Sequence, residues 1–334
     1  MTRTTNLDDV LFRAKVVPAT AVVETATGTR QIRSPTARLI VDVDHDRVVG
    51  AVGNGYRVVT NQQALDWAYR CGQAVFPKTS AADWSVLSVD GPSTGSYCRI
   101  DVGHRKTALD FSLKSPGLLQ EAFGPFIRVT NSFNGQRALR FDIGLLRRMC
   151  TNGVIITDTL VSFRFVHSKA SLATTPEFTV DHPRLTAWLD GFDANLETLR
   201  GQSMAPAVIL ELVLGVLRLR PPNSPDAPDH LVGEWEAIQK HLQKLVARYV
   251  TEVGENAYAA FNVMTDFATR PKGHGSYARE IHTLQRRVGA WLPDFCARSR
   301  LPGFRMEEYV KDFGSAPAAK SPDAGRVAAR STAS

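Results

Sequence analysis

The chain has 334 residues, of which 43% are hydrophobic and 22% charged, and its formal net charge is +7. These values are typical of a soluble globular protein with one large or two ordinary domains. The four cysteines lie far apart without a C-x-x-C pair, and no secretory signal or membrane-length apolar run occurs. We therefore expect no zinc ribbon, no disulfide framework, no membrane anchor and a cytoplasmic location.

Residues 1–36 are weakly patterned and are predicted as a partly ordered N-terminal arm with an edge strand near Ala21 to Glu24. From residue 37 the chain favours strands at 37–43 and 47–53 around a turn. Asp42, Asp44 and Asp46 alternate, so in an extended strand they would share one face. That face is either a divalent-cation site or a solvated strand that runs into an Asp-rich turn.

Thr60 and Gln63 form a capping box, which predicts a helix that ends near Gly72. Two short strands, 84–89 and 97–102, follow it and lead into the cluster Gly103-His104-Arg105-Lys106. Two cations beside a glycine at a strand end suit a phosphate, but they suit an ordinary solvated turn as well.

The segment 126–165 is predicted as strand, turn, strand, short helix and strand. Asn134-Gly135 is a typical hairpin turn, and it would place Arg128 and Arg137 on one face with Arg140 on the other. The helix is predicted from Asp142 to Gly153, with paired arginines off its apolar stripe.

Basic charge is concentrated between residues 97 and 170, where eleven Lys and Arg face five Asp and Glu. Such a concentration predicts a polyanion as partner, with Phe133 or Phe141 as a stacking platform for bases. The alternative is that these cations pair with acids elsewhere or solvate an exposed face. The candidate nucleic-acid-binding residues are Arg99, Arg105, Lys106, Arg128, Asn131, Phe133, Arg137, Arg140, Arg147, Arg148, Arg164 and Lys169.

After residue 170 the pattern becomes helical, and residues 171–334 carry 19 basic and 19 acidic residues. Helices are predicted at 185–199, 208–219, 229–253, 256–269 and 276–291. The expected fold class is α+β: an antiparallel β-rich core with hairpin-helix units (β-β-β-α like), then an α-helical half. The expected domains are the arm at 1–36, a nucleic-acid-binding core at 37–170, a helical domain at 183–313 and a disordered tail at 314–334.

The usual catalytic motifs are missing from the sequence. There is no P-loop, no G-x-S-x-G elbow, no H-E-x-x-H pair and no Rossmann glycine fingerprint. We therefore predict no catalytic residue, no cofactor and no metal. A nuclease that uses Asp101, Asp110 and Asp142 with a divalent ion stays open, because such a site needs no contiguous motif.

Three segments resemble one family. They are VGNGYRVVTNQQALDW near Val52, VTNSFNGQRALRFDIGLLRRMCTNGV near Val129 and ENAYAAFNVMTDFATR near Glu255. They resemble the phage- and plasmid-borne domain of unknown function 932 family over roughly residues 40–295. The matching residues are Ser132, Asn134, Gly135, Arg148, Cys150, Asn152 and Gly153 in the middle block and Asn262, Val263, Met264 and Thr265 in the last.

The resemblance implies an origin in a mobile element of a bacterial cell. The predicted core is similar to that of single-strand annealing proteins of the Redβ and RecT type, which implies ATP-independent binding of single-stranded DNA, strand annealing in recombination, and a homo-oligomeric ring or filament. Trp235, Tyr249, Tyr258 and Trp291 are then either subunit contacts or core. The alternatives are an interaction or inhibitor protein that acts on a host factor and the metal-dependent nuclease.

Overall fold

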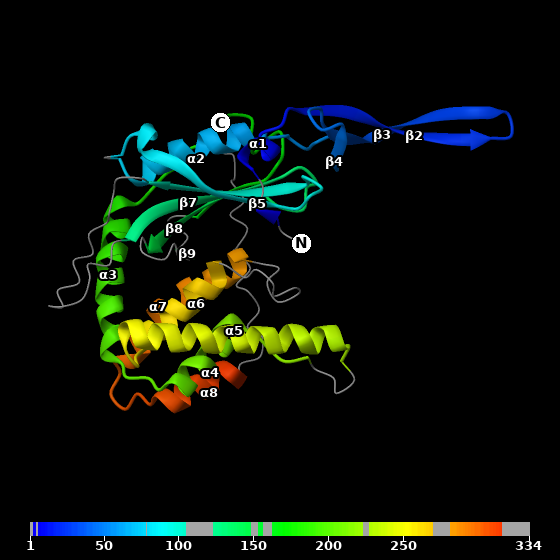
Figure 1. The fold of residues 1–334 in the computed structure, drawn as a ribbon. Helices are drawn as coiled ribbons and strands as arrows, with labels where there is room; N and C mark the ends of the chain where they lie inside the picture. The colour runs from blue at the N-terminus through cyan, green and yellow to red at the C-terminus, as the bar shows by residue number, and fades with distance from the viewer. Residues whose placement is uncertain are drawn as a thin grey trace.

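The computed structural model describes residues 3–4, 6–77, 79–104, 123–147, 153–155, 162–222, 227–269 and 281–315. Two antiparallel β-sheets form first along the chain, and a layer of helices follows (Figure 1). The predicted α+β class, with β-sheets in the N-terminal part and helices in the C-terminal half, is confirmed.

The main sheet has seven strands in the order β1-β5-β6-β7-β8-β10, and β9 pairs with β8. Its hydrophobic residues alternate along the strands, as Ile100, Val129 and Ile143 show, and are fully buried. The strands are β1 (Arg3–Thr4), β5 (Trp84–Gly91), β6 (Tyr97–His104), β7 (Phe123–Ser132), β8 (Leu139–Arg147), β9 (Gly153–Ile155) and β10 (Ser162–Phe165).

Helix α2 (Asn61–Val75) packs into the same core as the apolar face of the main sheet. The predicted capping box is confirmed: the Gln63 N–H donates to Thr60 Oγ1 at 3.1 Å, and the Thr60 N–H donates to Gln63 Oε1 at 3.0 Å. The short helices α1 (Leu7–Val10) and η1 (Ala81–Asp83) flank it in sequence. One face of the main sheet is thus covered by α2.

The second sheet contains β2 (Ala14–Thr25), β3 (Gly28–Asp42) and β4 (Arg47–Gly53). Strand β4 pairs only with residues 37–42 of β3, so residues 20–33 continue as a two-stranded ribbon. From here on, the arm means this ribbon of residues 20–33 and not the whole segment 1–36. It projects from the body of the protein (Figure 1). The residues predicted as an edge strand, Ala21 to Glu24, lie within it.

The helix predicted from Asp142 is wrong over the part that the structure describes. Strand β8 runs to Arg147, and Asp142 is paired with Arg128 of β7. Phe141, Ile143 and Leu145 alternate with polar or small residues, and burial of this alternating face outweighs the weaker helical spacing. Residues 148–152, where the helix was predicted to end, lie outside the described part of the chain.

The C-terminal half contains α3 (His182–Gly201), α4 (Pro206–Leu217), α5 (Asp229–Val253), α6 (Ala257–Thr269), α7 (Ile281–Ser299) and α8 (Met306–Ser315). All the helices predicted after residue 170 are found, α5 with the predicted bounds, whereas α8 was not predicted. Helix α6 is buried from Ala257 to Ala268, because α3, α4, α5 and α7 pack around it. Helix α3 extends from the sheet layer to the helical layer (Figure 1). Within the described residues, every helix is too short or too polar to span a membrane.

Candidate nucleic-acid interface

The register of the β7-β8 hairpin decides which charged residues share a face. The turn lies where the sequence predicts it, and Gly135 has a positive φ of 74°. However, Thr130 pairs with Arg140 and Arg128 with Asp142, so the hairpin is centred on Gly135 itself. The sequence predicted Arg140 on the other face of the sheet from Arg128. That prediction is wrong: the pairing is shifted by one residue, which moves Arg140 to the same face as Arg128.

The result is a face of alternating acids and arginines on the side of the sheet opposite α2. We call it the paired face, and it consists of Asp90, Arg99, Asp101, Arg128, Arg140 and Asp142. The Arg128 guanidinium donates to both oxygens of Asp101, with Nε–Oδ1 at 2.7 Å and Nη2–Oδ2 at 2.6 Å, and also to Gln285 on α7. Burial alone would lower the pKa of Arg128, but the carboxylates of Asp101, Asp142 and Asp90 together outweigh it and raise the pKa.

The other two arginines of the paired face also have carboxylate partners. Arg99, buried at 4% exposure, lies 3.2 Å from Asp90, and burial raises the pKa of that carboxyl while Arg99 opposes the rise. Arg140 donates to Asp142 Oδ1 at 3.2 Å, and the Ser162 hydroxyl donates to the same oxygen at 2.6 Å. These arginines neutralise carboxylates that are buried, as in Asp142, or half-buried, as in Asp90 and Asp101, which confirms for them the interpretation that the cations pair with acids.

Helix α7 brings His282 to the paired face. Its Nε2 lies 3.7 Å from Asp142 Oδ2. Burial lowers the pKa of His282 to about 3, although the Asp142 charge opposes the fall. The ring is therefore neutral at pH 7, and Arg140 is the cation that pairs with Asp142.

The remaining predicted contacts on the strands are structural. Asn131 is fully buried and donates from Nδ2 to the Val59 carbonyl at 2.9 Å and to Asn61 Oδ1 at 2.7 Å, which ties β7 to the start of α2. Phe133 packs on Phe12, with ring centroids 5.1 Å apart, in a small core that also contains Ile40 and Val49 of the second sheet. Phe141 is fully buried among other aromatic rings. In this conformation none of these three side chains is exposed to a strand of nucleic acid.

The other predicted contacts fall into two groups. Arg137 stacks over the Tyr97 ring at 4.5 Å and is half-buried, whereas Arg164 and Lys169 are exposed. Arg105, Lys106, Arg148 and the side chain of Arg147 lie outside the described residues. His104, next to that cluster, is buried edge-on against Trp84, with ring centroids 5.2 Å apart.

Hydrogen bonds connect Lys169 and the segment after β10 to two cations that the sequence did not single out, Arg38 and Arg57. The Lys169 N–H donates to the Gly55 carbonyl, the Arg57 N–H donates to the His167 carbonyl, and Arg38 Nε donates to Asn54 Oδ1 at 2.9 Å. We call Arg38, Arg57, Arg164 and Lys169 the basic edge. All four are exposed, and within the described residues none has an ion pair.

The arm continues this surface beyond β4. From Arg13 to Arg38 the sequence has five cations and one carboxylate, Glu24. Arg30 and Arg33 of the arm, and Lys15 on the strand that leads into it, are exposed without an ion pair within the part of the chain described here, whereas Arg13 pairs with Asp44 at 2.6 Å. A charge count over this short stretch, made separately from the longer basic segment, was the signal that would have identified the arm.

The three alternating aspartates take part in a turn. Asp42 is fully buried and accepts from the backbone N–H groups of Asp44 and His45 and from Arg47 Nε at 2.9 Å. The Arg13 guanidinium holds the pKa of the Asp44 carboxyl below its usual value. Within the described residues, no group of three His, Cys, Asp or Glu side chains is arranged to hold a metal ion. Asp110, part of the nuclease alternative, lies outside them.

Most of the aromatic residues considered as subunit contacts belong to the helical core. Tyr249 and Tyr258 are fully buried and Trp291 is 2% exposed, so these three do not form a contact surface. The Tyr249 hydroxyl donates to Asp266 at 2.7 Å inside that core. Trp235 is half-buried.

A cavity of about 450 Å³ lies between the paired face and the helices. It is lined by members of the paired face together with Ser88, His104, Thr269 and Ile281. Because the arginines in its wall already bind carboxylates, the wall offers a ligand little uncompensated charge. The exposed cations of the basic edge and the arm therefore remain the better candidate interface.

Comparisons with known proteins identify a family without a known activity. The family model described as a domain of unknown function (DUF932) matches residues 103–291, from the end of β6 to the middle of α7. No curated protein and no solved structure matches the chain. Since the match covers more than half of the 334 residues, the chain belongs to the DUF932 family.

Proposed function

We propose that this protein binds single-stranded DNA without ATP and promotes annealing of complementary strands, in the bacterial cell that hosts the mobile element encoding it. The proposal is supported by a difference between two sets of cations: one set forms ion pairs with acids and the other does not. The arginines of the paired face neutralise acids, while the basic edge and the arm present cations without ion pairs among the described residues. A surface of that kind attracts a phosphate backbone.

The geometry also revises how the strand is held. Phosphates contact Arg38, Arg57, Arg164 and Lys169, the four exposed cations of the basic edge. Exposed aromatic rings are scarce there: Tyr56 is half-buried and stacks on His167 with centroids 4.8 Å apart. The proposed interaction is therefore dominated by the backbone and depends little on base sequence.

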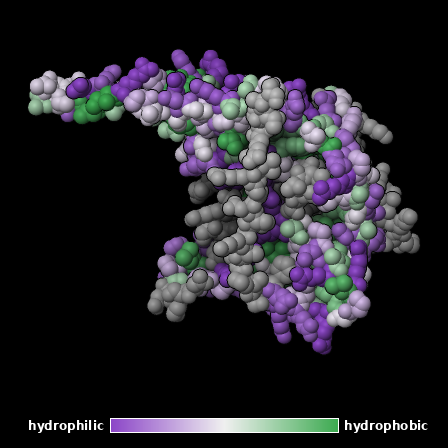
Figure 2. Space-filling model, turned by 180° about the vertical axis from the view of Figure 1, so that it is seen from behind, coloured by the Kyte–Doolittle hydropathy of each residue, from purple (hydrophilic) through white to green (hydrophobic). Residues whose placement is uncertain are grey.

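Assembly follows from the arm. A two-stranded ribbon is marginally stable in water, and this one exposes Val22 at 64% and Ile32 at 52%. Hydrophobic and hydrophilic surface alternate along it (Figure 2). We propose that the arm contacts a neighbouring copy, which joins the basic edges of successive subunits into a ring or filament.

The test is a fluorescence-anisotropy titration with labelled oligo-dT at several salt concentrations. We expect log K to fall with log [salt] by about 0.7 per phosphate contact. The variant R57A/R164A should bind more weakly and lower the slope by about 1.4, the sum of two contacts. The matched control is R248A/R305A, which removes two exposed arginines that pair with Glu252 and Glu308. Absence of binding at low salt would refute the proposal.

Two further measurements separate the finer claims. Light scattering with and without a long single strand should report a mass many times the 36.7 kDa of one chain, and a monomer in both conditions would refute annealing by an assembly. Complementary labelled strands should pair faster with the protein and without ATP. Degradation of a labelled strand on addition of Mg²⁺ or Mn²⁺ would instead favour the nuclease.

A further inference from the structure

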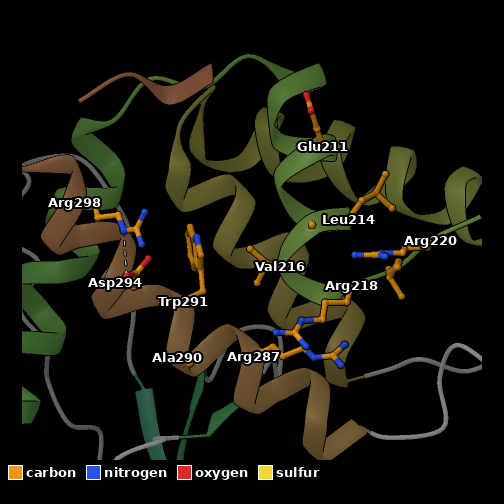
Figure 3. Close-up of a pocket in the computed structure, with 12 residues that line it drawn as sticks. Glu211, Leu214, Val216, Arg218, Arg220, Arg287, Ala290, Trp291, Asp294 and Arg298 are labelled. Carbon is orange, nitrogen blue, oxygen red and sulfur yellow. Dashed lines mark ion pairs between the residues drawn. The ribbon is translucent and has the colours of Figure 1, made fainter. Parts of the chain in front are cut away.

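A second cavity, of about 540 Å³, lies in the helical half between the end of α4 and the middle of α7 (Figure 3). Cavities of this size hold ligands as large as a nucleotide. Its wall combines the cations Arg218, Arg220 and Arg287 with the apolar side chains of Val216, Leu219 and Trp291. We call it the arginine pocket, and it is far in sequence from the basic edge.

Three arginines line this pocket. Arg287 Nη1 donates to the Leu217 carbonyl at 2.6 Å, which fixes Arg287 at the carbonyl end of α4. The Arg218 guanidinium lies beside that of Arg287, and Arg220 also lines the pocket (Figure 3). Burial and the positive charge of Arg218 lower the pKa of Arg287. The fold therefore holds like charges together, which costs free energy unless an anion is present.

The acids in the wall do not neutralise these cations. Asp294 pairs with Arg298 at 3.3 Å and accepts from the Tyr309 hydroxyl at 3.2 Å. Glu211 precedes Arg218 by two helical turns, about 10 Å along the axis, and points away from it (Figure 3). In the described parts of the chain, Arg218, Arg220 and Arg287 have no carboxylate within ion-pair distance.

The backbone supplies an independent observation. Arg218 caps α4 in the left-handed conformation, with φ 54° and ψ 42°, where glycine is the usual residue. Asp46 is the other non-glycine residue with positive φ among those described. Strained backbone conformations are found most often at functional sites, so a strained arginine that faces a cavity indicates a functional role for its side chain.

We propose that the arginine pocket binds a small phosphorylated ligand of nucleotide size. The phosphate lies between Arg218, Arg220 and Arg287, where planar guanidinium groups donate paired hydrogen bonds to its oxygens. The apolar part of the ligand packs on Leu214 and Ala290, which line the pocket and are not buried. This site is separate from the strand-binding surface proposed above and does not depend on it.

The test uses the full-length protein and adenosine monophosphate as the probe in isothermal titration calorimetry. We expect one ligand per chain, and adenosine without the phosphate should bind at least tenfold more weakly. The variant R218G/R220A should lose at least tenfold in affinity. Because glycine relieves the left-handed strain, R218G alone should raise the melting temperature while it weakens binding, so a loss of affinity is not a loss of folding.

Controls distinguish this site from the strand-binding surface. R57A/R164A should bind adenosine monophosphate like the wild type, and R218G/R220A should bind oligo-dT like the wild type. Equal affinity for adenosine and its monophosphate, or unchanged affinity in R218G/R220A, would overturn the proposal. Loss of oligo-dT binding in R218G/R220A would also overturn it, because the pocket would then belong to a nucleic-acid strand.

Discussion

The paired face and the basic edge are both rich in arginine, yet the two regions use it differently. Arg128 is 5% exposed and is held by both oxygens of Asp101, so its charge stabilises the contact between the sheet and α7. Arg164 is two strands away, exposed and without an ion pair among the described residues. The net charge of a segment indicates that cations are present, but only their pairing shows which of them are free to bind a polyanion.

The largest effect is expected at the centre of the paired face. R128A removes the guanidinium from the half-buried Asp101 carboxylate and from Gln285, which should lower the free energy of unfolding by about 3–5 kcal/mol. Urea denaturation measures it. The double variant D101A/R128A should recover part of the loss, because no carboxylate is then left without its guanidinium partner. A loss below about 1 kcal/mol in R128A would contradict a structural role for this pair.

The next effect tests how the second sheet is joined to the main sheet. A Cβ on Gly50 of β4 would collide with the Phe133 carbonyl, whereas Gly53 on the same strand has open space. G50A should therefore lower the free energy of unfolding by about 1–3 kcal/mol through overpacking, and G53A should have a smaller effect. Limited proteolysis should cut the arm sooner in G50A. Equal stability of the two variants would show that the second sheet is not held at this contact.

A third prediction concerns pH. The unfolded chain protonates His282 near its ordinary pKa of 6.5, while burial keeps the folded ring neutral down to about pH 3. The unfolded state thus binds more protons, and stability from this group is lost as pH falls below 6.5. Between pH 7 and pH 5 the loss should be about 1–2 kcal/mol. H282Q should show a shallower decline, and an unchanged pH profile would argue against the buried neutral ring.

The smallest effect on stability is expected on the basic edge. R164A removes an exposed side chain, so the free energy of unfolding should change by less than about 0.5 kcal/mol. The salt slope for oligo-dT should nevertheless fall by about 0.7, one phosphate contact. An unchanged slope together with unchanged stability would remove Arg164 from the proposed interface.

Local sequence determined much of the fold, for reasons visible in particular residues. The Thr60–Gln63 capping box starts α2, and helical spacing of apolar residues predicts the bounds of α5, because both signals act within one or two turns of chain. The family was also predicted from short segments, which the match over residues 103–291 confirms. The position of the turn at Gly135 belongs to the same class of local information.

The pairing of charges was decided by the tertiary structure. The register of β7 on β8 places Arg140 on the face of Arg128, and the burial of Phe141 and Ile143 turns a predicted helix into a strand. Asp101 meets Arg128 across two strands, and Gln285 reaches it from a helix more than 150 residues later in the chain. Free and neutralised arginines are identical in sequence, because the difference lies in partners that only long-range contacts bring within hydrogen-bonding distance.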